Sequence, residues 1–105
     1  MIDLPTIQTA VNLLLAAAPG SKVILFGSYA RGEADPRSDL DFLVVEPTVN
    51  NRHQEMVRLR QVLRPLHVPV DVHVVSAPLF EAWRDTPNTI IYEAAREGRV
   101  YEQVA

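Results

Sequence analysis

The chain has 105 residues, a formal net charge of −3 and hydrophobic residues at 48% of its positions. This balance is ordinary for one globular domain over residues 1–105 and argues against disorder. Cysteine is absent, which excludes disulfides, thiolate metal sites and a cysteine nucleophile, and fits a reducing cytoplasm. No apolar run approaches the ~20 residues that cross a bilayer, no basic segment indicates a signal peptide, and the acidic balance argues against nonspecific nucleic-acid binding.

Helical and strand patterns alternate in the first half of the chain. Asp3 can cap a helix whose first turn holds Pro5, and apolar residues then recur at helical spacing up to Pro19-Gly20. The predicted elements are a helix over residues 4–18, a buried strand over 22–26, a helical turn over 29–32, a loop over 33–38 and a strand over 39–45.

The second half continues the alternation. We expect a helix over residues 51–66, a strand over 70–75, a short helix over 77–84 and a last helix that begins at Thr86-Pro87 and stops at Gly98. Arg58, Arg60 and Arg64 mark a solvated face of the first of these helices, with partner contact as the alternative. The alternation predicts an α/β or α+β fold around a sheet of three or four strands.

Two carboxylates open the predicted strand over residues 39–45. Side chains alternate across a sheet, so Asp39 and Asp41 share one face while Leu40 and Phe42 point into the core. Two carboxylates at one spot repel each other, and a hard divalent cation such as Mg²⁺ removes that conflict. Taken alone, the pair is explained equally well as turn and strand-start chemistry.

A third carboxylate interrupts the next predicted strand. The valines of that strand fill one face, so Asp71 lies on the other face together with His73. If the two strands are neighbours, Asp71 joins Asp39 and Asp41, and three carboxylates can hold two metal ions roughly 4 Å apart, as in two-metal phosphoryl-transfer sites. A salt bridge is the alternative for Asp71, and a structural role is the alternative for His73.

A glycine-containing turn precedes these carboxylates. Gly27-Ser28 opens the short helical turn, where free backbone N–H groups can approach phosphates closely and the Ser28 hydroxyl can add a donor. Arg31 lies one turn further on and either reaches a phosphate or pairs with nearby acids. The turn lacks the lysine of a Walker A loop and the glycine pattern of a dinucleotide-binding loop.

Together these residues resemble a known family. Gly27-Ser28-x-x-x-Gly32, then Ser38-Asp39-x-Asp41, then a lone Asp71 on the next strand are similar to the DNA polymerase β-type nucleotidyltransferase superfamily. The chain resembles its minimal nucleotidyltransferase (MNT) branch over nearly its whole length, including the ending at residues 90–101. The resemblance implies a small mixed sheet packed by helices.

The resemblance also implies a nucleotide-binding set and a catalytic, metal-binding set. The first is Gly27, Ser28 and Arg31, and the second is Asp39, Asp41 and Asp71. Asp39 and Asp41 would bind both Mg²⁺ ions, and Asp71 would ligate the catalytic ion and lie near the attacking hydroxyl. The implied reaction transfers a nucleoside monophosphate, AMP from ATP, to an acceptor hydroxyl and releases pyrophosphate.

A partner protein is the acceptor that the resemblance implies. Larger relatives carry helical domains that grip the base and the acceptor, and this chain has no room for one. MNT proteins are commonly antitoxins of HEPN toxins, and some AMPylate the toxin on a tyrosine. The resemblance therefore implies a HEPN-type toxin as acceptor and complex partner, in a cytoplasmic hetero-oligomer.

Two other functions stay open at this point. A binding module could neutralise its partner by covering it without catalysis, or the transferase could act on a small molecule or an RNA. Phe80, Trp83 and Tyr92 are expected in the core or at a partner interface. Arg37, His53 and His67 are expected at the surface.

Overall fold

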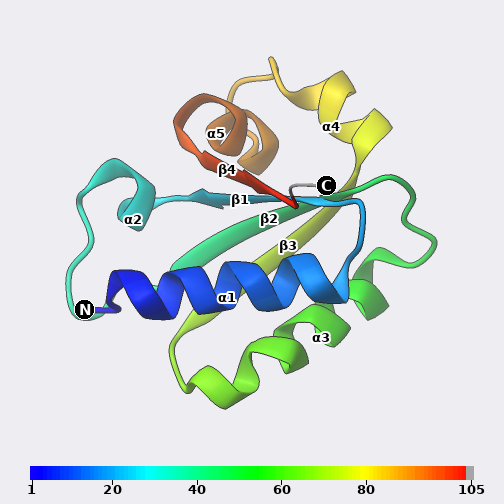
Figure 1. Ribbon diagram of the computed structural model, residues 1–105. Coiled ribbons are helices and arrows are strands. Elements are labelled where there is room, and N and C mark those ends of the chain that lie inside the picture. Colours follow the sequence, from blue (N-terminus) through cyan, green and yellow to red (C-terminus); the bar gives the residue numbers. More distant parts are fainter. Residues whose placement is uncertain (104–105) are drawn as a thin grey trace.

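The computed structural model describes residues 1–103. The elements are α1 (Leu4–Ala17), β1 (Lys22–Phe26), α2 (Ser28–Arg31), β2 (Leu40–Glu46), α3 (Arg52–Leu63), η1 (Arg64–Leu66), β3 (Val70–Ser76), α4 (Ala77–Trp83), α5 (Ile90–Glu97) and β4 (Arg99–Glu102). Helices lie on both sides of one sheet and form three layers, with α1 and α3 on one side and α4 and α5 on the other (Figure 1). None of these helices is long and apolar enough to cross a membrane.

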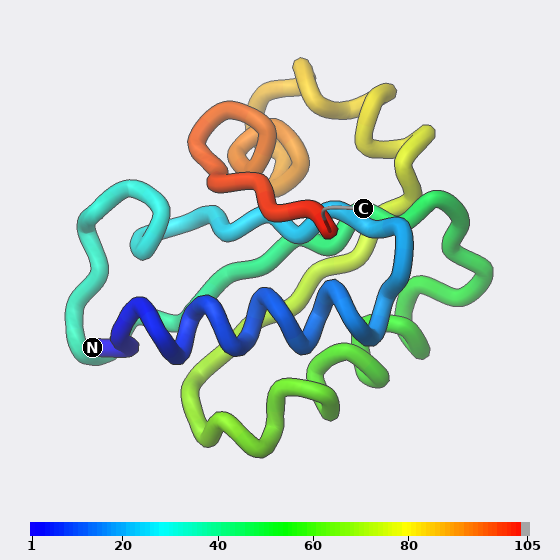
Figure 2. Tube along the Cα trace, viewed as in Figure 1, coloured from blue at the N-terminus to red at the C-terminus, as the bar shows by residue number. Residues whose placement is uncertain are grey.

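The sheet is small and mixed, as predicted. Its strand order is β3-β2-β1-β4. β1 runs antiparallel to both β2 and β4, whereas β2 and β3 are parallel. Figure 2 shows the C-terminal segment returning beside β1, where β4 forms the strand that no predicted range covers.

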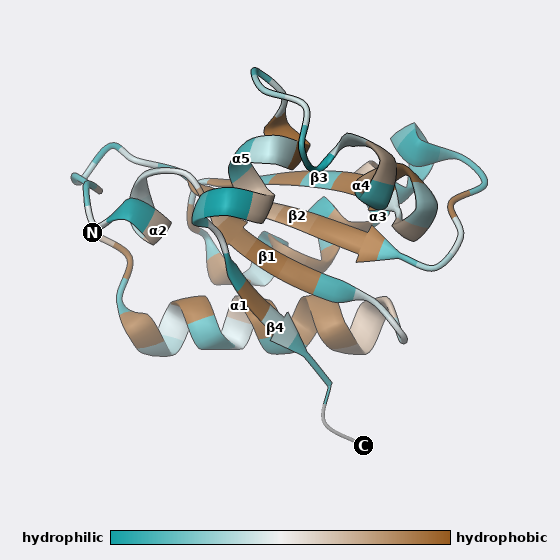
Figure 3. Cartoon of the chain, turned by 90° about the horizontal axis from the view of Figure 1, so that it is seen from above, coloured by the Kyte–Doolittle hydropathy of each residue, from teal (hydrophilic) through white to brown (hydrophobic). Residues whose placement is uncertain are grey.

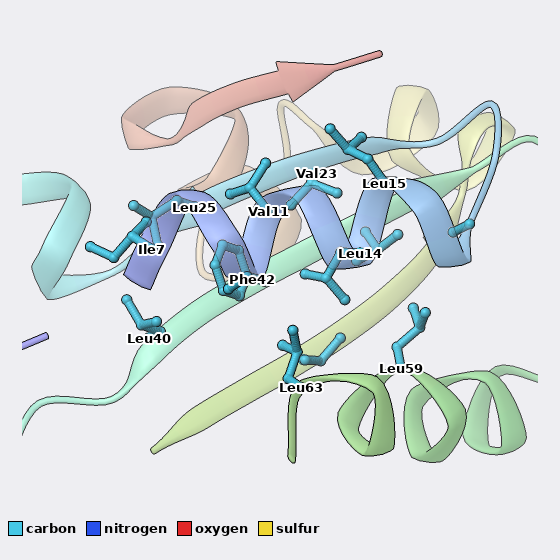
Figure 4. Close-up of a cluster of buried hydrophobic side chains, with 14 of the residues drawn as sticks. Ile7, Val11, Leu14, Leu15, Val23, Leu25, Leu40, Phe42, Leu59 and Leu63 are labelled. Carbon is cyan, nitrogen blue, oxygen red and sulfur yellow. The ribbon is translucent and has the colours of Figure 1, made fainter. Parts of the chain in front are cut away.

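Alternation along the strands divides the apolar residues between two cores. The larger core faces α1 and α3 and includes Phe42 and Leu14, both fully buried (Figure 4). Its strand members are Val23, Leu25, Leu40, Phe42, Val44, Val72 and Val74. The alternate residues of the same strands therefore belong to the other face.

The second core lies under α4 and α5. It holds Ile24, Phe26, Leu43, Val45 and Val75 from the strands, with Phe80 of α4 and Ala94 of α5. The central strands carry hydrophobic residues over most of their length in the view onto this face (Figure 3). Asp41 and Asp71 have the strand parity of this second core, so the sheet presents them on the α4 and α5 side.

The last helix begins three residues later than predicted. Thr89, not Thr86, is its N-cap, because the Thr89 hydroxyl accepts the Tyr92 N–H at 3.0 Å. Asn88 has a φ of 66°, a left-handed conformation that a helix starting at Thr86 would not allow. The Thr89 hydroxyl also donates to the Thr86 carbonyl at 2.8 Å, which closes the turn before the helix.

Proline ends α3 earlier than the predicted boundary at residue 66. Pro65 has no N–H to donate to the Gln61 carbonyl, so the Arg64 N–H bonds that carbonyl instead. The chain continues as the short 3₁₀ helix η1 and ends at His67, whose φ is 52°.

Gly98 is required for space rather than for backbone conformation. Its φ of −76° is open to any residue. A Cβ atom there would overlap Ile24 and the Ala94 carbonyl, and would lie 3.2 Å from the Leu25 carbonyl oxygen. Glycine thus lets the end of α5 meet β1 before the chain turns into β4.

Two arginines of α3 reach the outer edge of β3. Arg52 Nε donates to the Val74 carbonyl at 2.9 Å, and Arg60 Nη2 lies 3.4 Å from the Val72 carbonyl. The prediction of a merely solvated arginine face is therefore incomplete, because Arg60 is exposed but bonded to the sheet edge.

Two neighbouring carboxyl groups, Glu46 of β2 and Glu55 of α3, lie at the opposite end of the sheet from Asp41. Arg58 connects them to α1. Arg58 donates from Nε to Glu55 Oε1 at 2.7 Å and from Nη2 to Glu55 Oε2 at 2.8 Å. Its Nη2 also donates to the Ala17 carbonyl at 2.9 Å. Glu46 lies beside Glu55, and its Oε2 is buried without a hydrogen-bond partner in the described chain. Burial and the neighbouring Glu55 raise the pKa of Glu46 to about 7, whereas Arg58 lowers the pKa of Glu55 to about 2.

Replacing Gly98 with alanine should destabilise the fold. The added methyl group crowds Ile24 and two backbone carbonyls, so we expect a loss of about 1–3 kcal/mol in the free energy of unfolding, measured by urea denaturation. Val100→Thr, at a neighbouring exposed position, should change the free energy by less than ~0.5 kcal/mol. Equal effects of the two variants would contradict the close-approach explanation.

Glu46 should make the fold less stable as the pH rises from about 4.5 to about 7. The folded state holds a proton on Glu46 that the unfolded chain releases near pH 4.5, so the folded state binds more protons in this window. Glu46→Gln should therefore gain on the order of 1 kcal/mol over the parent chain at pH 8, after allowance for solvent screening, and little at pH 4.

Urea denaturation at the two pH values measures this difference. Glu81→Gln, at an exposed glutamate that pairs with Arg84, is the matched control. It should change the free energy of unfolding at neither pH. A Glu46→Gln variant with the parent's pH dependence would show that Glu46 ionises normally.

Candidate active site

Asp41 and Asp71 are direct neighbours across the parallel strands β2 and β3. The register pairs Asp41 with Asp71 and Leu43 with His73. Neighbouring strands lie about 4.8 Å apart, so the two carboxylates leave the same face of the sheet side by side. Asp39, where the predicted strand begins, comes just before β2, which starts one residue later at Leu40. It remains close enough to Asp41 to influence the pKa of that carboxyl group.

Gly27 places the turn directly against Asp41. The antiparallel register pairs Phe26 with Asp41, so the chain leaves β1 beside that carboxylate. Gly27 has a φ of 77°, and a Cβ atom there would overlap the Asp41 carboxylate, lying 3.2 Å from its Cγ. The glycine therefore serves both the backbone conformation and the close contact.

Ser28 begins α2 immediately beyond this contact. Gly27 is the N-cap of α2, and no side chain caps the helix. The Gly27 carbonyl accepts the N–H groups of Ala30 and Arg31, both at 3.1 Å, which fixes the turn. The turn and the carboxylates thus form one continuous site at the end of β1 and the beginnings of β2 and β3.

Asp41 carries an uncompensated charge. Burial is the largest of the causes that raise the pKa of Asp41, and the charges of Asp71 and Asp39 raise this pKa further. Glu93 of α5 adds a smaller effect in the same direction, and His73 opposes it. These causes identify the Asp41 carboxylate as a place where a cation would be stabilised.

Asp71 has hydrogen-bond and ion-pair partners of its own. Its Oδ1 accepts from Arg60 Nη2 at 2.9 Å, and its Oδ2 lies 3.1 Å from His73 Nε2. His73 in turn packs near the Phe26 ring, with centroids 6.0 Å apart. The salt bridge that the sequence left open for Asp71 is therefore present.

The donor set fits a hard divalent cation at Asp39 and Asp41. Neither residue takes part in an ion pair within residues 1–103, and carboxylate oxygens are the ligands that Mg²⁺ prefers. As they stand, no three His, Asp or Glu side chains of that part of the chain are gathered closely enough to hold a metal. Asp71 could join the set only by exchanging its bonds to Arg60 and His73, so its metal and catalytic roles stay predictions.

Arg31 pairs with acids in this structure. Its Nε lies 2.8 Å from Glu33, and its Nη1 lies 2.9 Å from Glu93 and 3.3 Å from Glu97. These contacts tie α2 to α5 above the site. Of the two alternatives for Arg31, the pairing with acids is observed, and the phosphate contact stays a prediction.

Other residues named from the sequence lie away from the carboxylates or at the surface. Phe80 is buried in the second core, as expected, but Trp83 is 45% exposed and does not belong to it. His53 and His67 are exposed, as predicted.

The sequence reasoning missed the site contacts of Arg60, Glu93 and Glu97. All three come from helices that reach the site only through the tertiary packing, and their spacing along the chain gives no sign of it. The nearest signal was the excess of arginine on the helix over residues 51–66.

Comparison with known proteins agrees with this geometry. The model of the nucleotidyltransferase domain family matches residues 7–99. A solved structure described as a minimal nucleotidyltransferase is similar with a TM-score of 0.64 and 31% identity, over 93% of this chain and 95% of the other. A solved toxin–antitoxin structure with AMP-PNP shares the fold, with a TM-score of 0.57 and 20% identity over 91% of this chain and 73% of the other. No curated protein matches the chain.

The family match spans the Gly27-Ser28 turn and all three carboxylates. It covers most of the chain, and the similar minimal nucleotidyltransferase is covered almost end to end. The chain therefore belongs to the nucleotidyltransferase domain family, as a domain of the minimal nucleotidyltransferase type.

Proposed function

We propose that this domain transfers a nucleoside monophosphate, AMP from ATP, to a hydroxyl group of a partner protein, and that this partner is a HEPN-type toxin for which the domain is the antitoxin. The observation that carries the proposal is the contact of the Gly27 turn with Asp41, whose cross-strand neighbour is Asp71. This arrangement provides a phosphate-binding turn and oxygen donors at one place.

The turn is suited to the triphosphate. Backbone N–H groups at the start of α2 and the Ser28 hydroxyl can donate to phosphate oxygens, and the glycine allows a close approach. Arg31 could add a cationic donor after release from Glu93 and Glu97. The β- and γ-phosphates would therefore lie on the β1 side of the carboxylates.

The carboxylates are suited to the reacting phosphate. Two Mg²⁺ ions bound there would lower the pKa of the attacking hydroxyl and neutralise charge on the leaving pyrophosphate. Asp39 and Asp41 provide oxygens without competing cations in the described chain. With pyrophosphate leaving toward Gly27, an in-line acceptor hydroxyl approaches from the β3 side, where Asp71 can accept its proton.

A structural likeness supports the partner assignment. The similar toxin–antitoxin structure with AMP-PNP shares the fold at 20% identity. Because that structure is described as a toxin–antitoxin structure, we infer that a second protein presents the acceptor hydroxyl.

Asp71 also favours a second candidate, neutralisation by binding alone. The ion pair of Asp71 with Arg60 and its contact with His73 give this carboxylate a structural role without any metal. A non-catalytic antitoxin of the same fold would cover its partner and need no transfer.

Asp39→Asn should abolish transfer without unfolding the protein. The substitution removes a charged oxygen donor from an exposed residue, so we expect a fall of ~100-fold or more in labelling. The assay incubates the domain with α-labelled ATP, Mg²⁺ and the protein encoded beside it, and follows label on that protein. Asp35→Asn, at an exposed acid in the loop before the site, is the matched control and should label normally.

The same assay separates the two candidates. Equal labelling by the parent and Asp39→Asn would contradict the assigned role, and no labelling by the parent would contradict transfer to this acceptor. Neutralisation of the partner that survives Asp41→Asn would establish binding as the mechanism.

Gly27→Ala should weaken triphosphate binding. The added methyl group displaces the Asp41 carboxylate or opens the turn, and the positive φ adds backbone strain of about 1–3 kcal/mol. We expect the dissociation constant for Mg–ATP, measured by calorimetry, to rise at least ~10-fold. Gly32→Ala has a similar φ of 73° but nothing within 4 Å of the added atom, so it should lose stability and retain binding.

A further inference from the structure

An apolar cavity opens beside the carboxylates on the α4 and α5 side of the sheet. It has a volume of about 260 Å³. Its floor is formed by Leu43, His73 and Val75, and α4 and α5 contribute Leu79, Trp83, Ile90 and Ile91. The lining therefore comes from the sheet and from α4 and α5. These two helices cover this face of the sheet (Figure 3).

The rim of the cavity exposes large apolar side chains. Leu79, Trp83 and Ile90 are 43%, 45% and 41% exposed. They are three of the seven exposed large hydrophobic residues in the described chain, and they gather around one opening. Grouped apolar exposure of this kind marks a binding surface.

The strands β2 and β3 provide both the carboxylates of the site and the floor of the cavity. Leu43 follows Asp41 by two residues and His73 follows Asp71 by two, so each lies about 6.6 Å further along the same face. His73 belongs to both places, because its Nε2 lies 3.1 Å from Asp71 and its side chain lines the cavity.

The geometry of in-line transfer allows the nucleoside to extend along the strands. The attacking and leaving oxygens lie roughly on one line at phosphorus, and that line runs across the strands from Asp71 toward Gly27. The sugar and base leave the phosphorus to the side of this line. Among the directions along the strands, one leads off the end of the sheet before Leu40, and the other leads to the cavity.

We propose that this cavity holds the base of the nucleoside triphosphate, stacked against Trp83. This inference rests on the proposed nucleotidyltransferase function and names its base-binding place. The volume suits one planar ring system and is smaller than the 300–1,000 Å³ of sites that enclose a whole drug-sized ligand. Stacking on an aromatic side chain is tolerant of base identity, so ATP and GTP should bind with similar affinity.

Trp83 is the single tryptophan of the chain, which makes its fluorescence a direct reporter. Titration with Mg–ATP should quench the Trp83 emission, whereas Mg–tripolyphosphate, which has no base, should bind without quenching it. In calorimetry, Trp83→Ala should weaken Mg–ATP binding at least ~10-fold and leave Mg–tripolyphosphate binding unchanged. Leu4→Ala, at an exposed apolar residue of α1, is the control and should leave both unchanged.

The outcomes separate this inference from the function on which it rests. Mg–ATP binding that neither quenches Trp83 nor weakens in Trp83→Ala would overturn the base site and leave the transferase proposal intact. The absence of binding by both Mg–ATP and Mg–tripolyphosphate would overturn both. If Trp83→Ala reduces only the labelling of a partner protein, the cavity belongs to the acceptor and the base assignment is wrong.

Discussion

The close packing of Gly27 against the Asp41 carboxylate is the constraint on which the site depends. It follows from the antiparallel register of β1 and β2, which brings the end of β1 beside Asp41. The same register directs the start of α2 toward the carboxylates. A side chain at position 27 would push the turn away from the Asp41 carboxylate. The absence of a Cβ atom at Gly27 therefore allows the turn and the carboxylates to form one site.

The charges around the site explain how a cation would be recruited. Asp41 is surrounded by acids, and the nearest cations are already engaged, Arg31 with three glutamates and Arg60 with Asp71. A nucleoside triphosphate alone would meet this negative field unfavourably. Together with divalent cations it supplies the missing charge, so metal and nucleotide binding should depend on each other.

Local patterns were enough to predict most of the fold and the faces of the strands. The parity of Asp41 and Asp71 follows from alternation alone, and their adjacency needed only the parallel pairing of β2 with β3. The predicted start of α5 was wrong because both Thr86-Pro87 and Thr89 can begin a helix. The left-handed conformation of Asn88 places the start at Thr89. β4 is short, and its pairing with β1 is a long-range contact that no local pattern encodes.

The partners of the site residues could not be predicted in the same way. Arg60 meets Asp71 because α3 packs along the edge of β3, and Glu93 meets Arg31 because α5 packs on β1, the strand that leads into α2. Both contacts depend on how the layers are stacked. The sequence pattern of an exposed helix face is the same whether a long side chain on it ends in solvent or contacts a neighbouring element.

The guanidinium groups of Arg52 and Arg60 have a consequence for assembly. They occupy carbonyl groups on the outer edge of β3 that would otherwise accept a foreign strand. Extension of the sheet in that direction is thereby hindered, which disfavours edge-to-edge aggregation. A partner that adds a strand to this sheet would have to do so beside β4, at the far border from Asp71.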